Sequence, residues 1–110
     1  WGTGKASREF IYVEDAARGI LLATEKYNSK DPVNIGSGKE ITIKELVDII
    51  SNEVGYNGEI KWDLSKPDGQ PRRCLNTDKA KTAFSFEAKV SIEEGIEKTV
   101  DWYYKNSNSV

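Results

Sequence analysis

Residues 33–46 read VNIGSGKEITIKEL, in which a short apolar run, a glycine turn and a helix start follow one another. A brief apolar run bounded by turn residues predicts a short buried strand over residues 33–35. Thr42 and Glu45 have the spacing of a T-x-x-E capping box, so a helix is expected to begin at Ile43. A strand and a helix in such close succession favour a mixed α/β fold.

Helices and short strands alternate along the rest of the chain. From Val13 onward, apolar residues recur at three- and four-residue spacing, which predicts a helix over residues 14–26. Ser91 and Glu94 form a second capping-box pattern and predict a last helix. Gly55 is expected to end the helix that begins at Ile43. The other expectations are strands over residues 9–13 and 59–63, a short helix over 77–84, and a frayed end over 106–110.

The composition is that of one globular domain and argues against two classes of protein. A chain of 110 residues with 37% hydrophobic and 31% charged residues has room for a single domain with a modest core. No stretch approaches the roughly 18 apolar residues of a membrane-spanning helix, so no membrane association is expected. The net charge is −2 and both signs are spread along the chain, so no nucleic acid partner is expected.

Cysteine and histidine usage narrows the possible chemistry. Cys74 is the only cysteine and there is no histidine, so neither an internal disulfide, a zinc finger nor a Cys–His pair can form. We expect no metal site, interpret Cys74 as a small buried hydrophobic residue, and expect a reducing, cytoplasmic setting. The chain begins at Trp1 with no Met and no leader, so we expect that its natural N-terminus is missing.

Two glycine clusters do not match nucleotide-binding loops. The turn at residues 36–38 has no third glycine at Ile41, and the Gly-Lys pair at residues 4–5 is followed by Ala6 instead of Ser or Thr. We interpret both as tight turns and expect no cofactor-binding residue. No pairing of a base with a nucleophile can be inferred either, so no catalytic residue is expected. Three tyrosines are interpreted as packing aromatics, Tyr12, Tyr103 and Tyr104.

The polar loop over residues 65–73 reads SKPDGQPRR and is the candidate binding segment. Its prolines and its Asp-Gly turn restrict the backbone, and a pre-shaped loop lowers the entropy cost of holding arginine against a diphosphate. The alternative interpretation is an exposed, solvated loop. Arg8, beside Glu9, can likewise form a surface ion pair of little energetic weight.

Several segments, taken in order, resemble the C-terminal part of the GDP-L-fucose synthase family, within the extended short-chain dehydrogenase/reductases that act on nucleotide sugars. The REF of residues 8–10 and the NIG of residues 34–36 occur widely among extended short-chain enzymes. The KPDGQPR of residues 66–72 is the sharper marker and favours the GDP-sugar branch. Ser85 stands where this family commonly has glycine. Further matching segments are residues 1–4, 42–46, 54–56 and 102–103.

The resemblance implies that residues 1–110 are a small mixed α/β substrate-binding lobe whose Rossmann lobe is absent. The intact enzyme would be NADP-dependent and would convert GDP-4-keto-6-deoxy-D-mannose to GDP-L-fucose by epimerisation and reduction. NADP(H) would be bound by the missing lobe, the parent is expected to be a homodimer, and the present chain alone is expected to be inactive. Because the lobe would pack on its partner lobe, an exposed apolar surface is also expected, and with it either self-association or marginal stability of the isolated chain.

The resemblance also implies a set of site residues. Trp1, Arg8 and Asp68 match family positions that contact the nucleotide sugar, and Arg72 is a further candidate in the same loop. A diphosphate suits Arg8, a ring face suits Trp1, and donor groups on guanine or ribose suit a carboxylate. Two alternatives stay open: a lobe of an extended short-chain epimerase or dehydratase that acts on a UDP- or dTDP-sugar, and a free-standing binding module.

Overall fold

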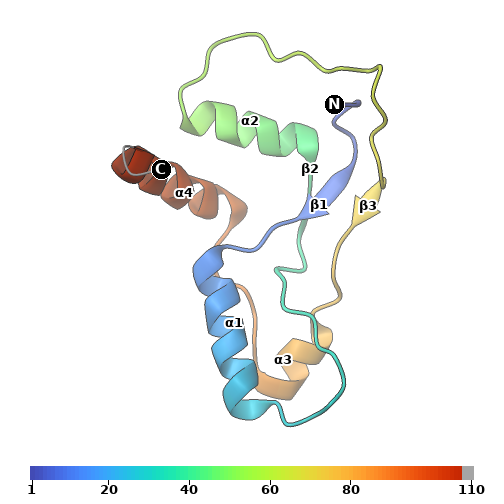
Figure 1. Ribbon diagram of the computed structural model, residues 1–110, viewed down its shortest axis with the longest axis vertical. Helices are drawn as coiled ribbons and strands as arrows, with labels where there is room; N and C mark the ends of the chain where they lie inside the picture. The colour runs from blue at the N-terminus through green and yellow to red at the C-terminus, as the bar shows by residue number, and fades with distance from the viewer. Residues whose placement is uncertain (108–110) are drawn as a thin grey trace.

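A small sheet joins the two ends of the structure, with its central strand paired differently on each side (Figure 1). The computed structural model describes residues 1–107. The strands are β1 (Ser7–Glu9), β2 (Glu40–Thr42) and β3 (Arg72–Arg73), in the order β2-β1-β3. β1 pairs antiparallel with β2 and parallel with β3. The central strand carries Arg8 and is held on both sides.

The strand predictions were only partly correct. The first strand lies at Ser7–Glu9, earlier than the predicted residues 9–13, and residues 33–35 and 59–63 form no strand. Val33 and Ile35 nevertheless pack against the hydrophobic core. The prediction that this apolar run contributes to the interior is therefore correct, although the run pairs with no strand.

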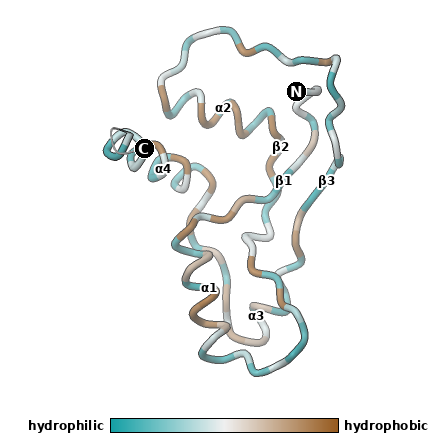
Figure 2. Tube along the Cα trace, viewed as in Figure 1, coloured by the Kyte–Doolittle hydropathy of each residue, from teal (hydrophilic) through white to brown (hydrophobic). Residues whose placement is uncertain are grey.

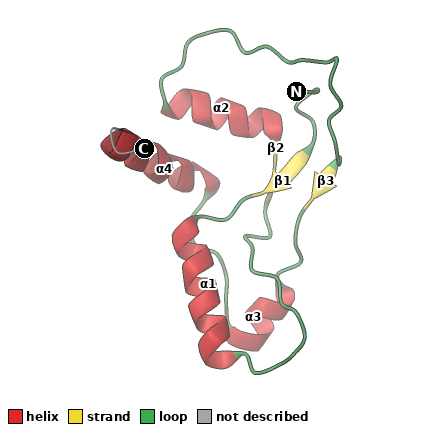
Figure 3. Cartoon of the chain, viewed as in Figure 1, coloured by secondary structure: helices red, strands yellow, loops and turns green. Residues whose placement is uncertain are grey.

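Four helices lie in the described part of the chain: α1 (Val13–Lys26), α2 (Ile43–Glu53), α3 (Asp78–Phe84) and α4 (Ile92–Asn106). They confirm the four predicted helices, with boundaries shifted by at most a residue where a boundary was predicted. The predicted fraying at the end of the chain falls largely on residues 108–110, outside the described residues. In Figure 1, α1 and α3 lie together at one end and α2 and α4 at the other, and contacts between the helices agree. Figure 3 shows the long irregular loop that connects α2 to β3.

Of the two predicted capping boxes, one forms completely and the other only in part. Thr42 and Glu45 form the predicted capping box: the Glu45 amide donates to Thr42 Oγ1 (3.2 Å), and the Thr42 amide donates to the Glu45 carboxylate (2.9 Å). At α4 only half of the predicted box forms. Ser91 Oγ accepts from the Glu94 amide (3.2 Å), but the Glu94 carboxylate pairs with Lys98 (2.6 Å), one helical turn on.

Two helices end at residues in the left-handed conformation. Gly55 has φ +65° and follows α2, as predicted. Ser85 has φ 56° and follows α3, in a conformation that glycine adopts without steric cost. The glycine common at this position in the resembling family therefore has a conformational reason.

The hydrophobic core is small and lies at the α1–α3 end. Its centre is Phe86, 1% exposed, which packs beside Phe84 and Ala80. Gly19 in α1 lets this layer approach the helix, because a Cβ there would lie only 2.7 Å from Ile35 Cγ2 and 3.0 Å from the Phe86 ring. The interior therefore depends on a few aromatic side chains and one close helix contact.

A buried carboxylate connects α1 to the chain just before α4. Asp15 is 3% exposed and accepts from the amides of Lys89 and Val90, each at 2.8 Å, and from Arg18 at 2.6 Å. Burial alone would raise the pKa of Asp15, but the Val90 amide, the Arg18 guanidinium and the Lys89 amide outweigh it and hold this pKa below its ordinary value. Asp15 is thus an ionised structural anchor.

The molecule is elongated and leaves much apolar surface uncovered. Its radius of gyration is 16.6 Å, against about 13 Å for a compact domain of this length. Figure 2 shows hydrophobic residues along α1, α2 and α4. The expected exposed apolar surface is therefore present, and on α1 and α4 it includes Val13, Ile20, Leu21, Trp102, Tyr103 and Tyr104.

The tyrosine interpretation holds at one position of three. Tyr12 is half-buried and lies next to Gly95, where an added Cβ would be 3.5 Å from its ring. The prediction is wrong for Tyr103 and Tyr104, because these side chains are 57% and 60% exposed.

Cys74 is half-buried, less enclosed than predicted, and burial raises the pKa of its thiol. Over residues 1–107, no helix has the length and apolarity needed to cross a membrane.

Candidate functional site

The first eight residues run alongside the loop that leads into β3 (Figure 1). The Gly2 amide donates to the Asp63 carbonyl (2.9 Å), and the Ser7 amide donates to the Pro71 carbonyl (2.9 Å). These two segments are far apart in sequence, and together they form one surface that carries Trp1, Arg8 and Asp68. The structure therefore brings these three predicted site residues into one region.

Both carboxylate oxygens of Asp68 accept hydrogen bonds from the N-terminal segment. Oδ1 accepts from the Thr3 amide (2.5 Å) and Oδ2 accepts from Thr3 Oγ1 (2.7 Å). The Thr3 hydroxyl and amide hold the pKa of Asp68 below its ordinary value. Gly2 has φ +69°, and a Cβ there would lie 2.1 Å from Asp68 Oδ1, so this approach requires glycine.

Arg8 is held by main-chain oxygens instead of by a carboxylate. Its Nη1 donates to the carbonyls of Ser7 (2.6 Å) and Gln70 (2.8 Å). The adjacent Glu9 accepts from the amides of Gly38 (2.9 Å) and Leu75 (2.6 Å), so the alternative of an Arg8–Glu9 ion pair is not realised. Nε and Nη2 of Arg8 donate to no group among residues 1–107, which leaves this guanidinium with donors for an anion.

The Glu9 carboxylate occupies the glycine turn over residues 36–38. Burial alone would raise the pKa of Glu9, but the amides of Leu75 and Gly38 outweigh it and keep the pKa below its ordinary value. A Cβ at Gly36 would lie 2.1 Å from Glu9 Oε1. This turn is therefore filled by a carboxylate of its own chain and does not fit the phosphates of a dinucleotide, which confirms its interpretation as a structural turn.

Trp1 is the most exposed aromatic residue of the site, with 81% of its surface accessible. Lys66 Nζ lies 5.7 Å from the centre of the Trp1 ring, a cation–π distance. Lys66 lies in the polar loop over residues 65–73, and nothing in the sequence distinguishes it from the other charged residues of that loop. Its place beside Trp1 depends on the pairing of two distant segments, which no local pattern encodes.

Arg72 and Arg73 lie on opposite faces of the sheet. The parallel register places Arg72 beside Ser7 and Arg73 beside Arg8, and successive strand residues point to opposite faces. Arg72 binds Glu40 through Nε (2.8 Å) and Nη2 and lowers the pKa of that carboxyl. Arg72 is thus separated from the other predicted site residues.

Arg73 takes the position next to Arg8 and was missed in the sequence. Its guanidinium has no hydrogen-bond or ion-pair partner within the described residues. Two neighbouring arginines that both retain free donors make a stronger anion site than either one alone. The only signal in the sequence was the doubled arginine, and it cannot show which member faces Arg8.

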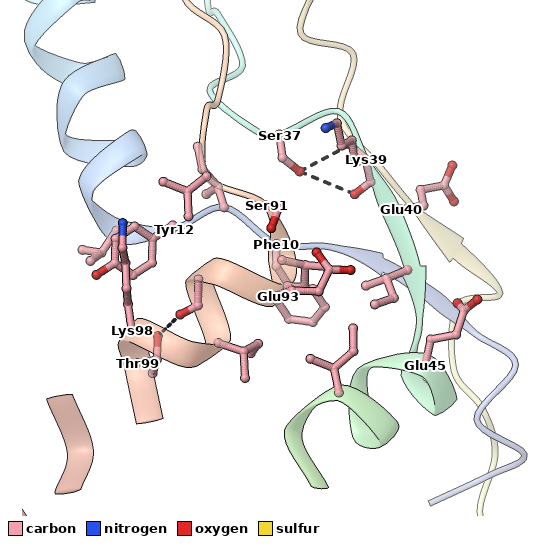
Figure 4. A pocket seen from close by; sticks show the side chains of 18 of the residues that line it. Phe10, Tyr12, Ser37, Lys39, Glu40, Glu45, Ser91, Glu93, Lys98 and Thr99 are labelled. Carbon is pink, nitrogen blue, oxygen red and sulfur yellow. Dashed lines mark hydrogen bonds between the residues drawn. The ribbon is translucent and has the colours of Figure 1, made fainter. Parts of the chain in front are cut away.

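A separate cleft of about 970 Å³ opens between α2, α4 and residues 10–13 (Figure 4). Its floor is apolar and includes Phe10, Ile49 and Trp102. None of the four predicted site residues lines it. Four carboxylates border it and only two lysines, so a diphosphate would meet net repulsion there; the charged members are Lys39, Glu40, Glu45, Asp48, Glu93 and Lys98.

Known proteins match this chain along its length. The model of the NAD dependent epimerase/dehydratase family matches residues 1–36. GDP-L-fucose synthase 1 of Arabidopsis thaliana is 42% identical over 106 residues, which are 96% of this chain and 32% of that protein. The chain is homologous to part of an NAD-dependent epimerase/dehydratase. GDP-L-fucose synthase of Escherichia coli (strain K12) is 34% identical to this chain, over 98% of the chain and 36% of that protein.

Solved structures confirm the small mixed α/β fold. A UDP-glucose 4-epimerase from Thermotoga maritima, solved with UDP-glucose, superposes on this segment with a TM-score of 0.88 and 33% identity. The match covers 97% of the segment and 34% of that chain. The segment therefore spans about a third of the length of the relatives it matches.

Proposed function

We propose that this segment is the nucleotide-sugar-binding part of an NADP-dependent epimerase-reductase that makes GDP-L-fucose from GDP-4-keto-6-deoxy-D-mannose. One observation carries the proposal: the N-terminal segment and the loop before β3 bring Trp1, Lys66, Arg8 and Arg73 together on one surface. The identity to GDP-L-fucose synthases supports GDP as the nucleotide.

The chemistry of these side chains suits a nucleoside diphosphate linked to a sugar. Arg8 and Arg73 offer guanidinium donors to the diphosphate, which they can bind with two hydrogen bonds each. Trp1 offers a ring face on which a base or sugar can pack. The parts of this site are thus two cations for the phosphates and an exposed aromatic ring at one end.

Replacing Arg8 with alanine is expected to weaken GDP binding by the complete enzyme about ten- to a hundredfold, because a charge-assisted hydrogen bond contributes about 1.5 to 3 kcal/mol. Isothermal titration with GDP measures this change. Arg72→Ala is the matched control: its side chain lies on the other sheet face against Glu40, and we expect unchanged GDP affinity. Equal losses in the two variants would show that the sheet face does not define the site.

A second candidate function is a UDP- or dTDP-sugar epimerase or dehydratase. The structural match to an epimerase that holds UDP-glucose favours it, since the fold is shared across nucleotides. Thermal denaturation of the complete enzyme with GDP, UDP or dTDP separates the two functions. Greater stabilisation by UDP or dTDP than by GDP would replace the first proposal with the second.

We assign NADP(H) and the proton-transferring groups to the part of the enzyme outside this chain. The glycine turn over residues 36–38 does not fit a dinucleotide, as its amide donors and space are taken by Glu9. The segment alone is accordingly expected to convert no substrate. A homodimeric parent enzyme stays a prediction from the resemblance.

The partner lobe is proposed to cover the outer face of α1. An apolar stripe with helical spacing runs along this face, and Val13, Ile20 and Leu21 within it are 69%, 60% and 64% exposed. The opposite face of α1 already packs on the core. A helix that is apolar on two faces is buried on both in a complete protein.

Uncovered, this stripe is expected to make the isolated chain self-associate. Ile20→Lys should weaken the association about tenfold or more, because burial of one such side chain contributes roughly 1.5 to 3 kcal/mol. Sedimentation velocity over a concentration series measures it. Glu25→Lys, on the same helix but outside the stripe, is the matched control and should associate like the parent chain. A wild-type chain that stays monomeric at every concentration contradicts the prediction.

A further inference from the structure

The helix pair α2 and α4 has no core of its own. The two helices contact each other, yet across both of them, which lie wholly within the described residues, Gly95 is the only buried residue. The apolar side chains that line the space between them are only partly covered, among them Ile49, Ile92 and Ile96. Helices in proteins obtain most of their stability from the packing of an apolar face. This pair therefore lacks an element that would complete its interior.

The cleft of about 970 Å³ between the two helices has room for such an element. Figure 4 shows Phe10 between the ribbons of α2 and α4. Phe10 and Trp102 line the cleft and are 42% and 57% exposed, so its apolar lining is open to solvent in this chain. Val13 also lines the cleft and begins the exposed stripe on α1. The cleft and the stripe thus form one continuous apolar surface, which a single neighbouring part of the protein can cover.

Carboxylates without a cation partner stand on both walls of the cleft. Asp48 of α2 and Glu93 of α4 line it, and neither carboxylate has a hydrogen-bond or ion-pair partner within residues 1–107. Lys98 is already paired with Glu94 at 2.6 Å, which leaves Lys39, at the β2 end, as the remaining cation of the lining. An apolar surface with lysine or arginine at its borders would complement this arrangement in both polarity and charge.

We propose that an amphipathic helix with lysine or arginine beside its apolar face fills this cleft, and that it belongs to the same polypeptide, outside residues 1–110. A helix satisfies its own backbone N–H and C=O groups, so it can be buried against walls that are themselves helices. The segment spans about a third of the length of its relatives, so the complete enzyme contains further chain that can supply this helix. The proposal goes beyond the proposed function, because it concerns a different surface and involves no nucleotide.

Thiol labelling of the complete enzyme, without nucleotide, tests whether the cleft is filled. Thr99 lines the cleft and is exposed in this chain. Thr99→Cys should react with a maleimide about tenfold or more slowly than Glu97→Cys, because the reagent reaches the cleft only when the packed helix opens. Glu97 is the matched control, since it is exposed on the same helix and does not line the cleft. Peptide mapping by mass spectrometry assigns each labelled cysteine. Labelling of Thr99→Cys as fast as that of Glu97→Cys would show an open cleft and overturn the proposal.

A charge reversal on the cleft wall tests the basic character of the occupant. Adding Asp48→Lys to the Thr99→Cys enzyme should speed labelling several-fold, because it places like charges against each other. Glu53→Lys makes the same change on α2 outside the cleft and should leave the rate unchanged. No acceleration by Asp48→Lys, or an equal acceleration by Glu53→Lys, would contradict a basic occupant.

Photocrosslinking identifies the occupant itself. With benzoylphenylalanine in place of Thr99, we expect a crosslink at the mass of a single polypeptide to a lysine- or arginine-bearing segment outside residues 1–110. A crosslinked product of twice that mass would place a second copy in the cleft and overturn the proposal. A crosslink confined to residues 1–110 would overturn it as well.

Discussion

Replacing Phe86 with alanine is expected to lower the free energy of unfolding by about 3 to 5 kcal/mol, the usual cost of emptying a core aromatic site. Phe86 is 1% exposed and is the largest fully buried side chain in the described structure. It packs against Phe84 with ring centres 6.4 Å apart and lies under the Arg18 guanidinium, 5.0 Å from its ring centre. So small a core has few other side chains that can move in to fill the cavity.

Urea denaturation followed by circular dichroism measures the loss. Phe10→Ala removes the same ring from a site that is 42% exposed at the edge of the α2–α4 cleft. We expect it to cost less than half as much, because much less area is returned to water. Similar losses in the two variants would mean that the core does not lie where the structure places it.

Asp15→Asn is expected to cost about 3 kcal/mol, the typical penalty when one partner of a buried charged pair is removed. The two amides that point at Asp15 are donors, as is Arg18, and an amide side chain would turn its own donor toward one of them. Glu14→Gln, one residue away on the exposed side of α1, is the control and should change stability little. A loss no larger than that of the control would contradict the anchoring role of Asp15.

The stability difference between wild type and Asp15→Asn should depend on pH. The folded-state pKa of Asp15 lies below the ordinary 3.8, so its contribution is fully present above the unfolded pKa. It is lost as the pH falls through the lower, folded pKa. Denaturation curves from pH 7 down to about pH 2 should therefore converge for the two proteins at the acid end. A constant difference across this range would show that the charge of Asp15 is not what stabilises the fold.

Local signals in the sequence predicted the helices and little of the sheet. The capping box of Thr42 and Glu45 spans four residues, so its outcome depends on almost nothing outside them. The strands are two or three residues long and obtain their hydrogen bonds from partners far away in the chain. Ser91 and Glu94 show the limit even for helices, since Lys98 competes for the carboxylate.

In the candidate site, too, the features that depend on contacts between distant segments could not be predicted from the sequence. The resemblance implied that Trp1, Arg8 and Asp68 contact the nucleotide sugar, which stays a prediction, and in the structure these residues lie on two segments that pair with each other. It could not indicate that Asp68 binds Thr3, or that Arg73 and not Arg72 lies beside Arg8, because both depend on the register of β1 against β3. Residue identity was readable from the sequence, whereas the direction of each side chain was set by tertiary pairing.

The pairing of the first residues with the loop before β3 also sets the order in which the chain folds. Thr3 and Asp68 are 65 residues apart, and Ser7 and Glu40 are 33 apart. Contacts of such large sequence separation form slowly, since a long loop must close before they return any free energy. The helices, with their local hydrogen bonds, form on a shorter timescale. We therefore expect the surface around Trp1 and Arg8 to assemble after the helices, and a nascent chain acquires it only after the residues up to Arg73 have been synthesised.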